Sequence, residues 1–237
     1  GAGSASLGGA RPKAQVRQGD DLWIAKFPHK SDEWDVLAFE KLALTLAAAM
    51  GIAVPETKLL RIDGSSVLLS KRFDRRGSDR IGYQSFMTAL LKRDGEPADY
   101  LEIAEELSLI STMPSRDLQE LFRRIALSVA IRNTDDHLRN HGLIRSGSGW
   151  ALSPVFDVNP TPISEGSLRA TSIAGAVGAE NEIAALVEHC GHFDLSRSQA
   201  RQILLELSAA LDSTAAMGEE LDIPQASLRP FLEVFGD

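Results

Sequence analysis

The chain has little cysteine, no long apolar run and no excess of basic residues. Cys190 is the one cysteine among 237 residues, which excludes an internal disulfide and a zinc-finger spacing. No apolar stretch reaches the roughly 18 residues of a membrane span, and no basic segment precedes an apolar one as in a secretory leader. Lys and Arg number 25 against 33 Asp and Glu, a net charge of −8, which argues against a broad nucleic-acid-binding face. We therefore expect a cytoplasmic protein without a membrane segment and without strong nucleic-acid binding of its own.

The remaining composition is that of a folded globular protein. The chain is 43% hydrophobic and 24% charged, which is ordinary for a soluble domain of this size. At this length it can bury a substantial core.

The most informative segment is the run N-T-D-D-H-L-R-N at residues 133–140, followed later by Asp157 in P-V-F-D. Asp135 and Asn140 have the D-x4-N spacing of a phosphoryl-transfer loop. In such a loop one Asp accepts a proton from a substrate hydroxyl, while the Asn and a later Asp hold magnesium against ATP phosphates. Between the two parts, residues 142–145 and 150–153 read as strands about the turn S-G-S-G, which predicts a hairpin that returns the chain toward its start.

Two other interpretations of this segment stay open on local pattern alone. Asn, Thr and Asp often cap turns through their own side chains. A metal hydrolase is also conceivable, because His137 and His141 are four residues apart. Zinc commonly needs three or four protein ligands, however, and the sequence has neither H-E-x-x-H nor a cysteine pair. Other parts of the chain must decide.

A lysine and a glutamate in the first part of the chain fit the kinase interpretation. Lys26 ends a predicted strand at 22–27, and Glu40 lies on a predicted helix at 36–50 that Gly51 closes. In kinases, a strand Lys paired with a Glu of the following helix is fixed against the nucleotide phosphates. The alternative is an exposed edge lysine and a solvated glutamate.

The segment S-A-S-L-G-G-A-R-P-K at 4–13 precedes this strand. Gly8 and Gly9 permit close backbone approach to a phosphate. The segment is neither a Walker A motif nor a G-x-G-x-x-G loop, and a flexible linker is the alternative.

Taken together, these segments resemble the HipA-like serine/threonine kinases, the toxins of bacterial toxin–antitoxin systems. The stretches that carry the resemblance are S-L-G-G-A-R-P-K (6–13), K-F-P (26–28), V-P-E (54–56), R-F-D-R (72–75), N-T-D-D-H-L-R-N-H-G (133–142) and L-S-P-V-F-D-V-N-P (152–160).

The resemblance implies an ATP- and magnesium-dependent protein kinase. It implies that Lys26, held by Glu40, contacts ATP phosphates, that Asp135 is the catalytic base, and that Asn140 and Asp157 bind magnesium. Asn140 thereby also belongs to the nucleotide site.

The resemblance also bears on the glycine-rich loop and on one departure. It implies that Gly8 and Gly9 cover the phosphates and that Ser6 is autophosphorylated, with Ser4 as a second candidate. Asp136 stands where some members carry Gly, which leaves the roles of two adjacent acids undivided. Full-length members also carry a small domain before this loop.

The implied partners are a protein substrate and an antitoxin. By resemblance the substrate is a cellular protein, with an aminoacyl-tRNA synthetase as a candidate, and a small DNA-binding antitoxin neutralises the kinase. Two alternatives share the site: a kinase-fold binding module without transferase activity, and a small-molecule kinase.

The expected fold class is α+β, a two-lobed protein-kinase-like fold with a small β-rich N-lobe (1–73) and a mainly helical C-lobe (74–237). Strands are predicted at 22–27, 57–62 and 67–70, and helices from Pro114 through Val129, at 182–189, at 196–210 and at 227–234. The resemblance places adenine at the hinge, 68–73. The arginines that follow the hinge are expected to be solvated or to make packing contacts: Arg72, Arg75, Arg76 and Arg80.

Overall fold

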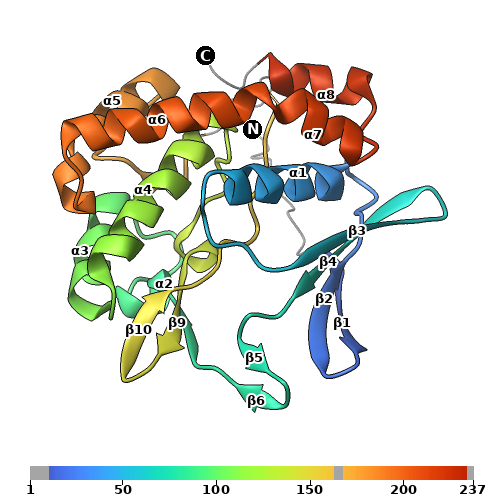
Figure 1. The fold of residues 1–237 in the computed structure, drawn as a ribbon, viewed down its shortest axis with the longest axis horizontal. Helices are drawn as coiled ribbons and strands as arrows, with labels where there is room; N and C mark the ends of the chain where they lie inside the picture. The colour runs from blue at the N-terminus through green and yellow to red at the C-terminus, as the bar shows by residue number, and fades with distance from the viewer. Residues whose placement is uncertain (1–10, 163–167, 234–237) are drawn as a thin grey trace, which may run out of the picture.

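The computed structural model describes residues 11–162 and 168–233. The predictions made for Ser4, Ser6, Gly8 and Gly9 lie outside these residues. The chain forms a small lobe built on a sheet and a larger lobe built on helices, as predicted, and the two lie side by side in Figure 1. The exact boundary predicted between residues 73 and 74 stays a prediction.

The small lobe is a four-stranded antiparallel sheet with one helix packed on it. The strands run in the order β1-β2-β4-β3, and the sheet therefore has one more strand than predicted. The added strand, β1, is exposed at all six residues, so its sequence lacks the apolar alternation that marks a half-buried strand. The bounds are β1 Lys13–Gln18, β2 Asp21–Lys26, β3 Thr57–Ile62, β4 Ser65–Lys71 and α1 Val36–Ala49.

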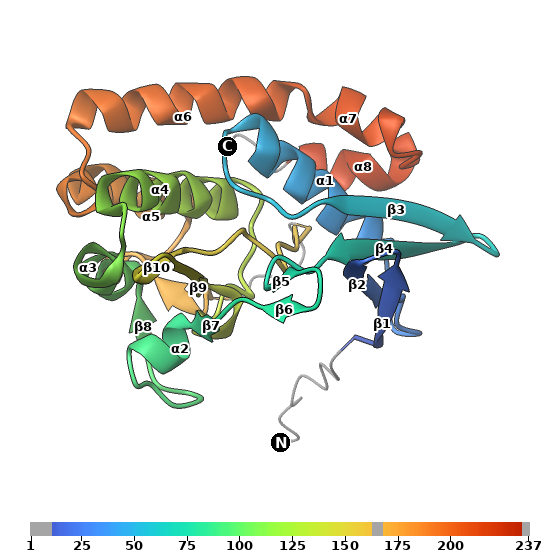
Figure 2. The same cartoon turned by 60° about the horizontal axis from the view of Figure 1, so that its bottom comes forward.

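Helix α1 begins and ends at residues suited to those positions. The Asp35 side chain accepts a hydrogen bond from the backbone nitrogen of Ala38 at 3.1 Å and so caps the first turn. Gly51 follows the helix with φ +73°, the left-handed conformation that favours glycine. Most of the helix is buried, because the sheet covers one side and C-terminal helices cover another (Figure 2).

The connection between the lobes leads into a second small sheet. After β4 the chain forms the short hairpin β5 (Arg75–Arg76) and β6 (Asp79–Arg80). Strand β7 (Tyr83–Ser85) then pairs with β9 (Gly142–Ser146), which pairs with β10 (Gly149–Leu152). The predicted hairpin is thus confirmed, and its turn contains Gly147 at φ +57°.

The large lobe is organised around α4. This helix starts with proline at its first position, as predicted, and ten of its residues are buried. Helices α2, α3 and α7 were not predicted. Helix α5 begins three residues before its predicted start, and α6 and α8 are displaced by one or two residues from their predicted bounds. The remaining bounds are α2 Phe86–Ala89, β8 Ala98–Asp99, α3 Tyr100–Ile110, α4 Pro114–Ala130, η1 Leu138–Asn140, β11 Thr171–Ser172, α5 Ala179–Glu188, η2 Cys190–Phe193, α6 Arg197–Asp212, α7 Thr214–Glu220 and α8 Gln225–Leu232.

Across the two described ranges, no helix combines the length and the apolar character needed to cross a membrane.

Candidate active site

Lys26 lies between two carboxylates in the cleft that separates the lobes. Its Nζ donates to Glu40 Oε1 at 2.6 Å and also to Asp157 Oδ1. The strand β2 supplies the lysine, α1 supplies the glutamate, and the segment after β10 supplies Asp157. Lys26 and Asp157 are 131 positions apart in sequence, and the fold brings them into direct contact.

The charged groups of this cluster shift one another's pKa values, against the effect of burial. Burial lowers the pKa of Lys26, but Glu40 and Asp157 raise it by more, so the amine stays charged. Burial raises the pKa of the Glu40 carboxyl, and Lys26 opposes that rise. Burial raises the pKa of Asp157 as well, yet Lys26 and Lys13 bring it below its ordinary value. Asp157 is therefore an ionised carboxylate that lines the cleft.

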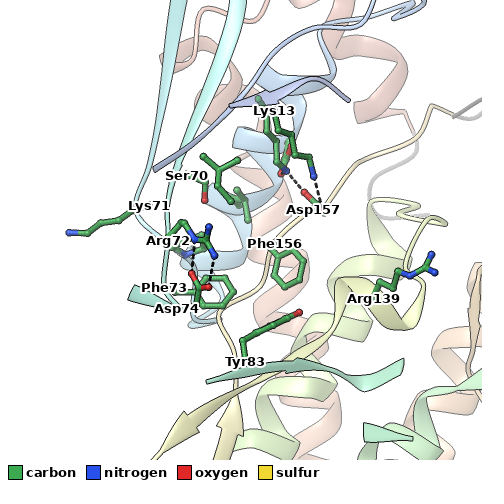
Figure 3. Close-up of a pocket in the computed structure, with 15 residues that line it drawn as sticks. Lys13, Ser70, Lys71, Arg72, Phe73, Asp74, Tyr83, Arg139, Phe156 and Asp157 are labelled. Atoms are coloured by element: carbon green, nitrogen blue, oxygen red, sulfur yellow. Dashed lines mark hydrogen bonds and ion pairs between the residues drawn. The ribbon is translucent and has the colours of Figure 1, made fainter. Parts of the chain in front are cut away.

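Lys13 is a second cation at this point, and its place beside Asp157 was not predicted from the sequence. It stands directly opposite Lys26 in the β1–β2 register, and its Nζ lies 3.6 Å from Asp157 Oδ2. Asp157 itself has φ +53°, a conformation that Asp tolerates better than most residues and that often marks functional positions. Figure 3 shows both Lys13 and Asp157 at the same end of the cavity.

The loop between α4 and β9 presents Asp135 to solvent. The Asp135 side chain is 74% exposed, and His137 Nε2 lies 3.5 Å from its Oδ1. Partial burial raises the pKa of Asp135, Asp136 and Asp157 add to the rise, and His137 opposes it. Asn140 Nδ2 donates to the Asp135 backbone carbonyl at 2.9 Å, which leaves the amide oxygen of Asn140 to act as a ligand.

Asp136, next to Asp135, is held in the interior instead. Its side chain is 1% exposed. Its Oδ2 accepts hydrogen bonds from Tyr100 Oη at 2.7 Å and Arg169 Nη1 at 2.6 Å, and its Oδ1 accepts from the backbone nitrogen of Thr171 at 3.2 Å. Arg169 Nε also contacts Glu182 Oε1 at 3.2 Å. The two adjacent acids thus have separate roles, one exposed at the cleft and one anchoring the loop.

A cavity of about 330 Å³ extends from Lys26 to the connection between the lobes. Three aromatic rings gather at its far side, Phe73, Tyr83 and Phe156, with centroids 5.9–6.2 Å apart (Figure 3). Residues 70–74 line the same cavity. A mostly apolar pocket beside cationic groups is suited to a flat base attached to phosphates.

A wider cleft adjoins this cavity and contains the remaining predicted residues. Its lining includes Lys26, Asp135, Asn140 and Asp157. A carboxylate and an amide oxygen are hard ligands of the kind that magnesium takes together with water and phosphate oxygens, so the donor set fits that ion. Over residues 11–162 and 168–233, no three His, Cys, Asp or Glu side chains are grouped as a metal site, which gives the hydrolase interpretation no support.

The remaining sequence features have structural explanations. Arg72 donates to both Asp74 carboxylate oxygens, at 2.8 and 2.6 Å, and Arg75 contacts the same carboxylate at 2.7 Å. This fits the expected packing contact. Cys190 is buried.

One known protein family resembles this chain along most of its length. Residues 5–215 match the family described as the HipA-like C-terminal domain. The chain belongs to this family. The curated relatives that this HipA-like chain matches include Y4dM of Sinorhizobium fredii (strain NBRC 101917 / NGR234), which is named as a candidate kinase. The two are 30% identical over 61% of the chain and 39% of the relative. Toxin YjjJ of Escherichia coli (strain K12) is 28% identical over 71% of the chain and 41% of the relative. The chain thus spans about two fifths of the length of these relatives.

Solved structures show the same fold. The HipA-like chain matches a structure titled Shewanella oneidensis MR-1 toxin–antitoxin system HipA, HipB and its operator DNA complex, with TM-score 0.73 and 18% identity over 96% of this chain and 63% of that one. It also matches the Helicobacter pylori proinflammatory kinase CtkA, with TM-score 0.57 and 13% identity over 94% and 92%. At these identities the likeness concerns the fold.

Proposed function

We propose that this HipA-like chain is an ATP- and magnesium-dependent serine/threonine protein kinase that acts as a toxin. The observation that carries the proposal is Lys26, buried between Glu40 and Asp157 in a cleft that Asp135 and Asn140 also line. In kinases a strand Lys paired with a Glu of the following helix holds the nucleotide phosphates, and an Asp of the large lobe holds magnesium beside them.

The chain's own side chains would divide the work as follows. Lys26 and Lys13 would bind phosphate oxygens, while Glu40 keeps Lys26 oriented. Asp157 and Asn140 would hold magnesium, which when bound neutralises charge on the transferred phosphoryl group. Asp135 would orient the acceptor hydroxyl and take its proton, a task that suits a carboxyl whose pKa is raised.

Positioning and charge stabilisation would supply most of the rate. Because Lys26, Glu40 and Asp157 are already in contact, the groups that bind phosphate need little rearrangement. Phe73, Tyr83 and Phe156 would bind the adenine beside the connection between the lobes, where residues 70–74 line the cavity.

Three finer statements belong to the same proposal. The acceptor would be a hydroxyl of a cellular protein, and Ser6 would be an autophosphorylation site in a loop in which Gly8 and Gly9 cover the phosphates. A small DNA-binding antitoxin would neutralise the kinase and supply the basic surface that a chain of net charge −8 lacks. One solved structure of similar fold is titled as a complex with HipB and operator DNA, which supports this pairing.

Incubation of the chain with labelled ATP, magnesium and a cell extract tests the proposal. We expect label in a protein, and Asp135→Asn should reduce the transfer by about a hundredfold or more, the scale for loss of a general base, with ATP binding retained. Asp212→Asn, at an exposed position on α6, is the matched control and should transfer normally. If Asp135→Asn transfers normally, the assignment of the base is wrong.

The same assay separates the alternatives. Tight ATP binding with no transfer to any species would indicate a kinase-fold binding module. Label that appears only in a small molecule would indicate a small-molecule kinase, because the acceptor is the one part of the reaction that the site residues do not specify.

A further inference from the structure

The C-terminal helices α7 and α8 lie against α1, the helix that carries Glu40. Both views of the fold show α1 between these two helices and the small-lobe sheet (Figures 1 and 2). The contact is a cluster of its own, separate from the main core. Its buried members are Ala38, Phe39, Leu42, Ile223, Leu228 and Phe231.

Two phenylalanine rings form the centre of this contact. Phe39 and Phe231 stack with ring centroids 3.8 Å apart and an interplanar angle of 25°. Both side chains are buried, at 0% and 2% exposure. Trp34, just before α1, meets Phe231 edge-on at 5.9 Å. Aromatic pairs of this kind fix orientation as well as burying area.

Phe39 and Glu40 are consecutive residues on α1, so their side chains leave the helix about 100° apart. Phe39 is directed to α8, and Glu40 is directed to Lys26. A rotation of α1 that lengthened the 2.6 Å contact between Lys26 and Glu40 would also move Phe39 relative to Phe231 and so disturb the ring stack. The stack of Phe39 on Phe231 therefore restricts the rotation of α1 and, with it, the direction of Glu40.

A second contact joins the same elements. Arg61 on β3 pairs with Asp35, which caps the first turn of α1. The Arg61 Nη2 also lies 3.4 Å from the backbone carbonyls of Leu221 and Asp222, in the turn between α7 and α8. The start of α1 and the C-terminal helices are thus tied through one guanidinium group.

We propose that α7 and α8 act as a clamp that holds α1 in the orientation required for phosphate binding, with Phe231 as its positioning residue. The inference rests on the proposed kinase function, because it assigns Phe231 an effect exerted through Glu40 and Lys26. Phe231 does not itself line either part of the cleft described above.

Phe231→Ala tests the clamp, with Phe231→Leu as a conservative variant that keeps most of the volume. The matched control is Phe193→Ala, which removes an equally buried ring that packs on Phe122 at 5.7 Å in the large lobe. We expect Phe231→Ala to lower kcat for phosphate transfer about ten- to hundredfold, the scale for misplaced catalytic groups. Phe231→Leu should recover most of the rate, and Phe193→Ala should keep the wild-type rate at a temperature at which it is folded.

A double-mutant cycle separates positioning from general destabilisation. If Phe231 acts through Glu40, then Phe231→Ala added to Glu40→Gln should cost much less than the same change in the wild type. Equal fold-losses in both backgrounds would overturn the proposal.

Amide hydrogen exchange in α1 gives a readout that needs no activity. Phe231→Ala should speed exchange across residues 36–49 at least tenfold, and Phe193→Ala should not. If the wild type transfers no phosphate, the kinase proposal fails while this measurement still decides whether the clamp exists. Unchanged exchange in α1 would overturn the clamp even in an active kinase.

Discussion

Replacing Arg169 by methionine should destabilise the chain far more than a typical arginine substitution. Arg169 and Asp136 have side chains that are 5% and 1% exposed and contact each other at 2.6 Å. Methionine retains much of the buried stem but leaves Asp136 as an uncompensated charge, and breaking a buried pair in this way costs about 3–5 kcal/mol. With an m-value of about 2–3 kcal/mol per molar urea, the unfolding midpoint should fall by about 1–2.5 M.

Two comparisons make this measurement specific to the buried pair. Arg229, whose side chain is 81% exposed and pairs with Glu233 at 3.1 Å, is the control, and Arg229→Met should cost about 0.5 kcal/mol or less. Asp136→Asn should cost about 1–3 kcal/mol, since Arg169 keeps Glu182. The double variant Arg169→Met with Asp136→Asn should cost less than the sum of the two single changes, because the stranded charge is gone. Urea unfolding followed by tryptophan fluorescence gives all four values. An Arg169→Met midpoint no lower than that of Arg229→Met would refute the reasoning.

Three further outcomes follow from the site. Asp157→Ala should abolish the magnesium dependence of ATP binding in calorimetry, and equal ATP affinities of the wild type with and without magnesium would contradict the ligand role. Burial lowers the pKa of His141 from 6.5 to about 4. Between these values the unfolded chain binds a proton that the folded chain does not, so the free energy of unfolding should fall by about 2 kcal/mol as the pH drops from 6.5 to about 5. His141→Gln should remove that part of the pH dependence in urea unfolding. The resemblance puts Ser6 in the loop that covers the phosphates, where an added charge of about −2 would repel them, so phosphorylation of Ser6 should block ATP binding. Mass spectrometry of the wild type and Ser6→Ala after incubation with ATP and magnesium tests this, and phosphorylated protein that binds ATP normally would refute it.

The sequence predicted the parts of the site whose signals are local. Lys26 ends a strand, Glu40 lies on a helix rich in apolar residues, and the hairpin between Asn140 and Asp157 has a glycine-containing turn, so each could be recognised from its neighbours. The same holds for α4, which starts at Pro114 and has a clear apolar stripe.

What the sequence could not provide was pairing between distant segments. Asp135 and Asp136 are chemically identical neighbours, and they are distinguished by Arg169, which lies 33 residues away. The contact of Lys13 with Asp157 was not predicted, because β1 is exposed along its length and its sequence has no apolar alternation that would mark it as a strand of the sheet. A signal for α3 was present, however: Asp99 and Glu102 have the spacing of the capping box that the structure contains.

The packing of α8 on α1 also bears on how the two lobes can move. Besides the chain that leaves β4, helix α1 of the small lobe contacts the large lobe at two places. Its second half, from Ala43 to Met50, packs in the main core, and its first half packs in the cluster around Phe231. A body attached along one edge can swing open widely, whereas one attached at two separated points is restricted to small sliding or twisting displacements. For the proposed kinase we therefore expect a nucleotide to enter and leave by local movement of the strands and loops at the mouth of the cleft, with little change in the distance between the two lobes.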